Sequence, residues 1–193
     1  MATRNGKAIR FAANAVRVFR GRDSTGVRGI RLLGGDRVVS MSIIADEDKE
    51  FILSVTENGY GKRTPVSDYR RSGRGGQGVA NIETSKRNGQ VMASFAVVEE
   101  DQLMLVTNMG QVIRIRVHGG EGDSIRIASR KTLGVRLFDV ADDDSEKVVS
   151  AGLVRETESD DEDDHEDNHT EGHEVTITAI KRVMKQPKPR QMP

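Results

Sequence analysis

The sequence of 193 residues has no cysteine and no tryptophan, and only 4% of its residues are aromatic. The lack of cysteine excludes disulfides and thiolate metal sites, and it is typical of a cytoplasmic protein. No apolar run approaches the roughly 20 residues that span a membrane. The first residues show no hydrophobic signal core. We therefore expect a cytoplasmic protein with no membrane association.

The chain also lacks any long amphipathic helical pattern. Its apolar residues are mainly Val, Ile, Leu and Met, and they fall in short runs separated by glycine-containing turns. This composition favours many short β-strands over a few long helices.

A short pattern of residues recurs three times along the chain. A Thr-x-x-Gly turn is followed by an arginine four residues beyond its glycine, and later by a Gly-Val pair. The turn glycines are 53 and 51 residues apart, a period typical of one propeller-type blade. The three copies are Thr3, Gly6, Arg10 and Gly26-Val27; Thr56, Gly59, Arg63 and Gly78-Val79; and Thr107, Gly110, Arg114 and Gly134-Val135.

Strand signals surround these turns. Apolar runs at 51–55 and 103–106 precede the second and third turns, whereas only two residues precede the first, so we expect this chain to be a piece of a longer protein. Polar and apolar residues alternate at 7–11, 113–117 and 125–127. The sequence predicts an all-β fold of propeller-like β-pinwheel repeats, about three blades, at residues 2–154. The expected repeats are about 2–45, 51–98 and 102–154.

The net charge of zero conceals a strong asymmetry. Residues 1–155 hold 25 bases and 19 acids, residues 156–174 hold eleven acids and no base, and the last 19 residues hold five bases and no acid. We expect residues 155–193 to be a disordered tail, first acidic and then basic. A basic body with an acidic tail is a common layout for a polyanion-binding protein, because the tail can compete for the same surface.

The strongest local feature is the Arg-Gly run at 70–78. Exposed backbone N–H groups beside Arg70, Arg71 and Arg74 would bind phosphate oxygens without reading bases. A solvated tight turn, or a disordered Arg-Gly segment of the RNA-binding kind, remains an alternative. Arg10, Arg63 and Arg114 recur at constant phase, so stacked blades would align them into a stripe that tracks a duplex. The predicted DNA contacts are Lys7, Arg10, Arg28, Lys62, Arg63, Arg70, Arg71, Arg74, Arg114, Arg116, Arg126, Arg130 and Lys131.

Catalytic and metal-binding constellations are missing from the sequence. Tyr60 and Tyr69 have no paired carboxylates nearby for covalent attack on DNA, so both are predicted to be structural. His165, His169 and His173 have a spacing that could chelate a metal on a helix, but their acidic surroundings favour disorder. No cofactor or metal is expected in this chain.

With these repeats, the chain resembles the C-terminal domain of the A-type subunits of bacterial DNA gyrase. The segments that carry the resemblance are 23–40, 56–69, 77–91 and 107–117; it covers about residues 2–154, and the acidic tail also resembles that of the family. It implies a six-bladed β-pinwheel of which this chain is the last three blades. Residues 74–78 (RGGQG) resemble the second half of the family's Gln-Arg-Arg-Gly-Gly-Lys-Gly wrapping box.

The resemblance also implies a function and partners. The family's basic rim binds and wraps duplex DNA, so that the enzyme introduces negative supercoils at the expense of ATP. Cleavage, ATP and Mg²⁺ belong elsewhere in an A2B2 assembly, with the gyrase B protein and the N-terminal part of the gyrase A protein as partners on the chromosome. Three alternatives stay open: the C-terminal domain of the A-type protein of topoisomerase IV, a propeller that binds proteins, and an RNA-binding Arg-Gly protein.

Overall fold

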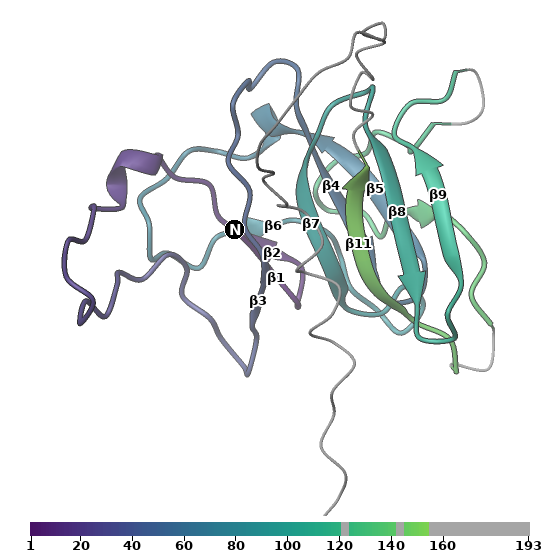
Figure 1. Cartoon of the computed structure of the whole chain (residues 1–193), viewed down its shortest axis with the longest axis horizontal. Helices are drawn as coiled ribbons and strands as arrows, with labels where there is room; N and C mark the ends of the chain where they lie inside the picture. Colours follow the sequence, from purple (N-terminus) through teal and green to yellow (C-terminus); the bar gives the residue numbers. More distant parts are fainter. Residues whose placement is uncertain (121–123, 142–144, 155–193) are drawn as a thin grey trace, which may run out of the picture. The chain divides into compact units, whose positions relative to one another are not determined.

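The computed structural model describes residues 1–120, 124–141 and 145–154, within a compact unit that comprises Met1–Glu156. These residues form three antiparallel sheets (Figure 1). The first has the strand order β3-β1-β2-β6, the second β10-β5-β4-β7 and the third β11-β8-β9. The strands are β1 (Ala2–Thr3), β2 (Lys7–Ala8), β3 (Val38–Ser40), β4 (Phe51–Thr56), β5 (Tyr60–Pro65), β6 (Val79–Ala80), β7 (Val91–Val97), β8 (Gln102–Thr107), β9 (Val112–Arg116), β10 (Val135–Arg136) and β11 (Val148–Val154).

The expected all-β, propeller-like fold is confirmed, with one sheet for each predicted repeat. The helical elements in the described residues are two short 3-10 helices, Ala13–Ala15 and Val66–Asp68. No helix in these residues is long and apolar enough to cross a membrane. The predicted disordered tail and its histidines lie outside the described residues.

The Thr-x-x-Gly turns join the two central strands of the first and second sheets, and they join the central strand β8 to the edge strand β9 in the third. In every copy the glycine N–H donates to the threonine carbonyl at 3.1 Å, at Gly6, Gly59 and Gly110. Antiparallel pairs follow directly, β1 with β2, β4 with β5 and β8 with β9. The sequence repeat is therefore a repeated hairpin.

The outer strand of two sheets comes from the next repeat along the chain. β6, which carries the second Gly-Val pair, adds to β2 of the first sheet with Val79 opposite Ala8. β10, which carries the third pair, adds to β5 of the second sheet with Val135 opposite Gly61. We call each such contact a junction, with a donor strand and an acceptor strand. The second and third repeats thus each complete the sheet of the repeat before them.

We call the residues just before the three Gly-Val pairs connectors 1, 2 and 3 (residues 17–25, 70–77 and 126–133). In the described residues, connectors 2 and 3 lead to junctions. Connectors 2 and 3 run beside the preceding sheet, because Arg10 forms a bridge to Arg71 and Arg63 forms one to Ile127. Among residues 125–127 only Ile127 forms a bridge, and it is isolated, so the prediction of a strand there was wrong. Their alternation reflects Ile125 packing into the core while Arg126 faces solvent.

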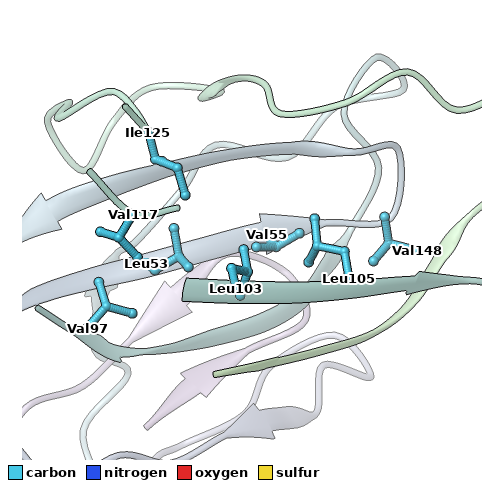
Figure 2. Close-up of a cluster of buried hydrophobic side chains, with 8 residues drawn as sticks. All are labelled: Leu53, Val55, Val97, Leu103, Leu105, Val117, Ile125 and Val148. Atoms are coloured by element: carbon cyan, nitrogen blue, oxygen red, sulfur yellow. The ribbon is translucent and has the colours of Figure 1, made fainter. Parts of the chain in front are cut away.

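The main apolar core lies between the second and third sheets (Figure 2). Strands β4 and β8 face each other through four side chains with no solvent exposure, Leu53, Val55, Leu103 and Leu105. The rest of this cluster is Val97, Val117, Ile125 and Val148. The buried side chains of this cluster are all branched aliphatic, and Phe51, Phe95 and Phe138 pack against it from partly buried positions.

A buried polar network joins the second repeat's hairpin to its own donor segment. Tyr69 donates to the side-chain oxygen of Asn81, whose amide donates to Ser54 Oγ at 2.9 Å and to Ser94 Oγ at 3.2 Å. Burial raises the pKa of Tyr69 well above its usual value. Tyr69 is only 3% exposed, so its predicted structural role is consistent with this position. Buried polar atoms that are all paired favour one register over its neighbours.

Gly78 tests the steric demand of a junction. It has φ +73°, and a Cβ there would lie far inside van der Waals distance of the Ala8 carbonyl oxygen. Gly35 has the same φ but open space around it.

We expect Gly35→Ala to lower the free energy of unfolding by about 1–2 kcal/mol, the cost of a left-handed backbone. Gly78→Ala should lower it by about 1–3 kcal/mol more, because the acceptor strand must shift.

Urea unfolding followed by far-ultraviolet circular dichroism measures both variants. Equal losses of stability at residues 35 and 78 would contradict a tight junction at Gly78.

Candidate nucleic-acid interface

The recurring arginines do not form an exposed stripe. Arg63 is 4% exposed, and its Nε donates to the carbonyl of Ile125 at 2.7 Å. Its Nη1 lies 3.2 Å from Glu99 Oε1, and its guanidinium lies over the Phe51 ring. The backbone N–H of Arg63 donates to the Arg126 carbonyl. Arg63 therefore clamps the third repeat onto the second, and this geometry corrects its prediction as a DNA contact.

Arg10 makes the equivalent clamp between the first two repeats. It is half-buried, and its Nη1 donates to the carbonyls of Val66 and Tyr69 at 3.2 and 3.1 Å. Its Nη2 forms an ion pair with Glu47. A guanidinium can satisfy several carbonyls that would otherwise be buried without a donor. This need for a donor at each junction explains why the arginines recur at the same position of the repeat. Of the three, only Arg114 is exposed, and the described residues contain no further repeat after its own.

Lys62 is fully buried, which also corrects its prediction as a DNA contact. Its Nζ donates to the carbonyl of Ser129 in connector 3. Burial, and then the positive charge of Arg130, lowers the pKa of Lys62 to about 8. Arg130 is half-buried and donates from Nη1 to the Ala80 carbonyl at 3.0 Å, with its guanidinium over the Tyr69 ring. Both cations hold connector 3 against the second repeat.

The remaining predicted residues are exposed, and they fall into two groups. Arg114 and Arg116 lie on the exposed face of β9, whereas Ile113 and Ile115 lie on its half-buried face, as the sequence predicts. The larger group lies in or beside the connectors. The exposed predicted residues are Lys7, Arg28, Arg70, Arg71, Arg74, Arg114, Arg116, Arg126 and Lys131.

Positive charge is concentrated in the three connectors. Together they hold nine of the 25 bases in residues 1–155, but only one of the 19 acids, Asp23. All nine bases except Arg130 are exposed. The connectors occupy equivalent places in successive repeats, directly before the Gly-Val pairs. They are the recurring basic surface that the sequence analysis assigned to the strand arginines.

Connector 2 is fixed to the first repeat through its backbone and through the side chains of Ser72 and Arg74. The N–H of Gly75 donates to the Gly29 carbonyl, and the Arg31 N–H donates to the Gly76 carbonyl at 2.8 Å. Arg74 donates from Nε to the Ala15 carbonyl at 3.0 Å. These bonds hold the loop while the side chains of Arg70 and Arg71 remain exposed. A fixed loop with exposed guanidinium groups is suited to bind phosphate.

Connector 3 repeats this arrangement on the second repeat. The N–H of Glu83 donates to the Thr132 carbonyl at 3.1 Å, as Arg31 does to Gly76 in the preceding junction. Thr64 Oγ1 donates to the Ala128 carbonyl at 2.7 Å. Arg126 and Lys131 remain exposed on this connector. Connectors 2 and 3 therefore present cations from matching positions.

The sequence analysis did not predict that two arginines, Arg87 and Arg136, bind the hydroxyl of Tyr60. Arg87 Nε and Arg136 Nη2 donate to the Tyr60 hydroxyl at 3.1 and 3.2 Å, and both guanidinium groups lie near its ring face. These bonds, Arg87 first, lower the pKa of Tyr60. Because Arg136 belongs to a donor strand, no local pattern could have paired it with Arg87. Tyr60 is buried with no carboxylate bonded to it in the described residues, which fits a structural role.

No three His, Asp or Glu side chains gather as metal ligands in the described ranges. A cavity of about 670 Å³ is lined mainly by apolar side chains of the first repeat, among them Ile9, Phe11 and Ile43. The basic connectors are therefore the candidate functional site.

Comparisons with known proteins point to one family. A family model described as DNA gyrase C-terminal domain, beta-propeller, matches residues 1–45, 50–97 and 101–155. The DNA gyrase A protein of Salmonella typhimurium is 43% identical over 157 residues, covering 81% of this chain and 17% of that protein. The DNA gyrase A protein of Rickettsia bellii is 35% identical over 208 residues, covering 84% and 22%. The chain thus spans about a fifth of the length of these relatives.

Solved structures show the same likeness. The C-terminal domain of DNA topoisomerase IV matches with a TM-score of 0.70 and 27% identity, over 79% of this chain and 45% of that one. The DNA gyrase A C-terminal domain matches with a TM-score of 0.67 and 27% identity, over 79% and 48%. Each solved domain is about twice as long as this chain's match to it.

The lowered pKa of Lys62 predicts a pH-dependent stability. Between pH 8 and the ordinary lysine value near 10.5, the unfolded chain keeps a proton that the folded chain has lost, so the free energy of unfolding rises with pH. Lys62→Met removes this contribution. We expect the wild type to gain stability relative to Lys62→Met between pH 7.5 and about 9.5, measured as the urea midpoint. A wild type that loses stability relative to the variant would show that the buried ammonium is favoured.

Proposed function

Because the chain belongs to the DNA gyrase C-terminal domain family, we propose that residues 1–154 form a module that binds and bends duplex DNA. The observation that carries this proposal is the charge of the connectors, nine bases against one acid. Outside them, residues 1–155 hold 16 bases and 18 acids. The connectors are therefore the surface on which a polyanion is held.

Binding takes place through phosphates. Guanidinium groups bind phosphate oxygens in a bidentate manner, and they carry no information about the base sequence. Arg70, Arg71, Arg126 and Lys131 supply exposed cations on connectors 2 and 3, and Arg20 supplies one on connector 1. Lys7, Arg28, Arg114 and Arg116 can extend this surface. Such binding tolerates any sequence and weakens with salt.

Bending follows from the fixed spacing of the connectors. Bending a duplex of 20–30 base pairs by 40–90° costs on the order of 1–6 kcal/mol, so several phosphate contacts must act together. Connectors 2 and 3 are each bonded to the preceding repeat. DNA that contacts successive connectors must follow the path that the stacked blades set. This is the basic rim that wraps DNA.

Within a larger enzyme, the module presents a bent DNA segment for strand passage. The partners are the N-terminal part of a gyrase A protein and the gyrase B protein, in an A2B2 assembly on the chromosome in the cytoplasm. That enzyme would use ATP and Mg²⁺ outside this chain to introduce negative supercoils. This chain supplies the path of the DNA and no catalytic group.

A second candidate is the corresponding domain of topoisomerase IV, since its solved C-terminal domain matches with a TM-score of 0.70. The identity of 35–43% to gyrase A proteins favours gyrase. An assay of an enzyme assembled from proteins that carry this domain separates the two, because gyrase introduces negative supercoils whereas topoisomerase IV relaxes supercoiled DNA.

Removal of exposed connector cations tests the phosphate surface. The variant Arg70→Gln/Arg126→Gln/Lys131→Gln loses about three phosphate contacts if the proposal holds. The slope of log association constant against log salt should then become shallower by about three, and affinity near 0.1 M salt should fall about 100-fold or more. Fluorescence anisotropy of a labelled duplex between 50 and 300 mM salt measures both quantities.

The matched control removes three exposed bases outside the connectors, in Arg37→Gln/Lys49→Gln/Lys86→Gln. It changes the net charge equally, so it should keep the wild-type slope. Identical behaviour of the two triple variants would locate binding elsewhere. A wild-type affinity that does not change from 50 to 300 mM salt would reject phosphate binding altogether.

The eleven acids of residues 156–174 are proposed to compete with DNA for the connectors. Deletion of this segment should tighten DNA binding at low salt, and the difference should shrink as salt screens the charges. Replacement of the same acids by Asn and Gln should have the same effect at constant length. Weaker binding after either change would show that the tail does not act as an electrostatic competitor.

A further inference from the structure

Two exposed arginines outside the connectors converge on one hydroxyl in the second repeat. Arg87 lies in the loop between β6 and β7, and Arg136 lies on β10, opposite Tyr60 of β5. The Arg87 Nε and the Arg136 Nη2 donate to the Tyr60 hydroxyl at 3.1 and 3.2 Å, so these two nitrogens lie within about 6.3 Å of each other. In the sequence, a described repeat precedes this one and another follows it.

Both guanidinium groups are held in place before a ligand binds. Their central carbons lie 5.2 Å (Arg87) and 5.6 Å (Arg136) from the centre of the Tyr60 ring. Tyr60 itself is only 4% exposed, so its ring is a fixed support. Asn58 donates from Nδ2 to the Arg87 carbonyl at 3.0 Å, which ties the loop to the hairpin turn. Side chains that are already ordered lose less freedom when a ligand binds.

The cluster has more hydrogen-bond donors than acceptors. A guanidinium carries five N–H donors, and the part of the chain that the structure describes supplies no acceptor for the two Nη atoms of Arg87. Arg136 donates from Nη1 to Asp139 at 2.6 Å, but the two side chains are 51% and 81% exposed, and exposed ion pairs are weak. The Tyr60 hydroxyl accepts two bonds, so its own proton remains for a further acceptor.

The charges of this cluster favour an anion. Two guanidinium groups so close together repel each other unless a negative group lies near both. Their hydrogen bonds, that of Arg87 first, lower the pKa of Tyr60, because they stabilise negative charge on its oxygen. A phosphate group has enough oxygens to accept from both guanidinium groups at once.

The repeat fold does not require this cluster. The residue directly after the turn glycine is Tyr60 in the second repeat, whereas it is Lys7 in the first and Gln111 in the third, both exposed. In the junction between the first two repeats, the donor residue opposite Lys7 is Ala80, which takes the place of Arg136. A hairpin and a junction therefore form without a tyrosine and two arginines at these places.

We propose that Arg87 and Arg136 form a binding site for a single phosphate group, with Tyr60 as the residue that positions them. The phosphate group can belong to free inorganic phosphate or to the backbone of DNA, since its oxygens are bound in the same way. Binding of free phosphate does not depend on the connectors, so this site and the proposed DNA binding can succeed or fail separately.

Inorganic phosphate is the probe, added to the full 193-residue chain and compared with chloride at equal ionic strength. Urea unfolding measures the effect. Phosphate at ten times its dissociation constant should raise the folding equilibrium constant about elevenfold, because it binds the folded chain. Arg87→Gln/Arg136→Gln should lose this gain. The control Arg37→Gln/Lys49→Gln has the same net charge and should keep it, and any general effect of phosphate on burial is common to both variants.

Two single variants separate binding from damage to the fold. Arg87→Gln changes only an exposed loop residue, and it should also lose most of the gain. Asp139→Asn removes the carboxylate that competes for Arg136. It should tighten phosphate binding by up to about fivefold, the range of an exposed ion pair. A less stable fold could not produce tighter binding.

Anisotropy of a labelled duplex in chloride buffer identifies the source of the phosphate group. If the site holds a backbone phosphate, Arg87→Gln/Arg136→Gln should weaken DNA binding and make the log–log salt slope shallower by about one. Unchanged DNA binding, together with a lost response to inorganic phosphate, assigns the site to free phosphate. A wild type that does not respond to phosphate, or an equal response in Arg87→Gln/Arg136→Gln and in the control, would overturn the site.

Discussion

The structure depends on the exchange of strands between successive repeats. The strands of Val79 and Val135 each pair with a sheet whose other strands belong to the preceding repeat. A repeat without its neighbour would expose an unpaired edge and the carbonyls that Arg10 or Arg63 satisfies. Stability is therefore carried by contacts between neighbours, as in other repeat proteins. The exchange also creates the connectors, because each donor strand has to cross from its own repeat to the preceding one.

Arginine recurs in this chain for two separate physical reasons. Arg10 and Arg63 recur because each junction brings carbonyl groups into a buried place where a guanidinium must donate to them. Arg70 and Arg126 recur at matching positions of connectors 2 and 3, where both side chains are exposed to solvent. Constant phase along a repeat therefore indicates equivalent surroundings, but it does not tell whether those surroundings are internal or external. Burial separates the two groups.

Local features of the fold could be predicted from the sequence, whereas the pairing between repeats could not. Thr56 and Gly59 signal a turn, and the alternation around Arg114 signals a half-exposed strand; both have local causes and are confirmed. Val135 belongs to a two-residue strand, which is too short to show a period, and its partner Gly61 is 74 residues away. The burial of Lys62 has no local signal either, because its acceptor is a backbone carbonyl of connector 3. Errors about the site arose from these non-local pairings.

Topology, more than total charge, decides where this surface can hold a polyanion. Outside the connectors, residues 1–155 have slightly more acids than bases, so a phosphate backbone gains little there. Within them, Arg74 and the connector backbone are bonded to the preceding repeat, so the loops lose little freedom when they bind. Because connectors 2 and 3 are each fixed at a junction, the spacing of these two cationic loops is the spacing of the blades. A ligand long enough to contact several of them must take up the curvature of the repeat stack, and a short anion cannot.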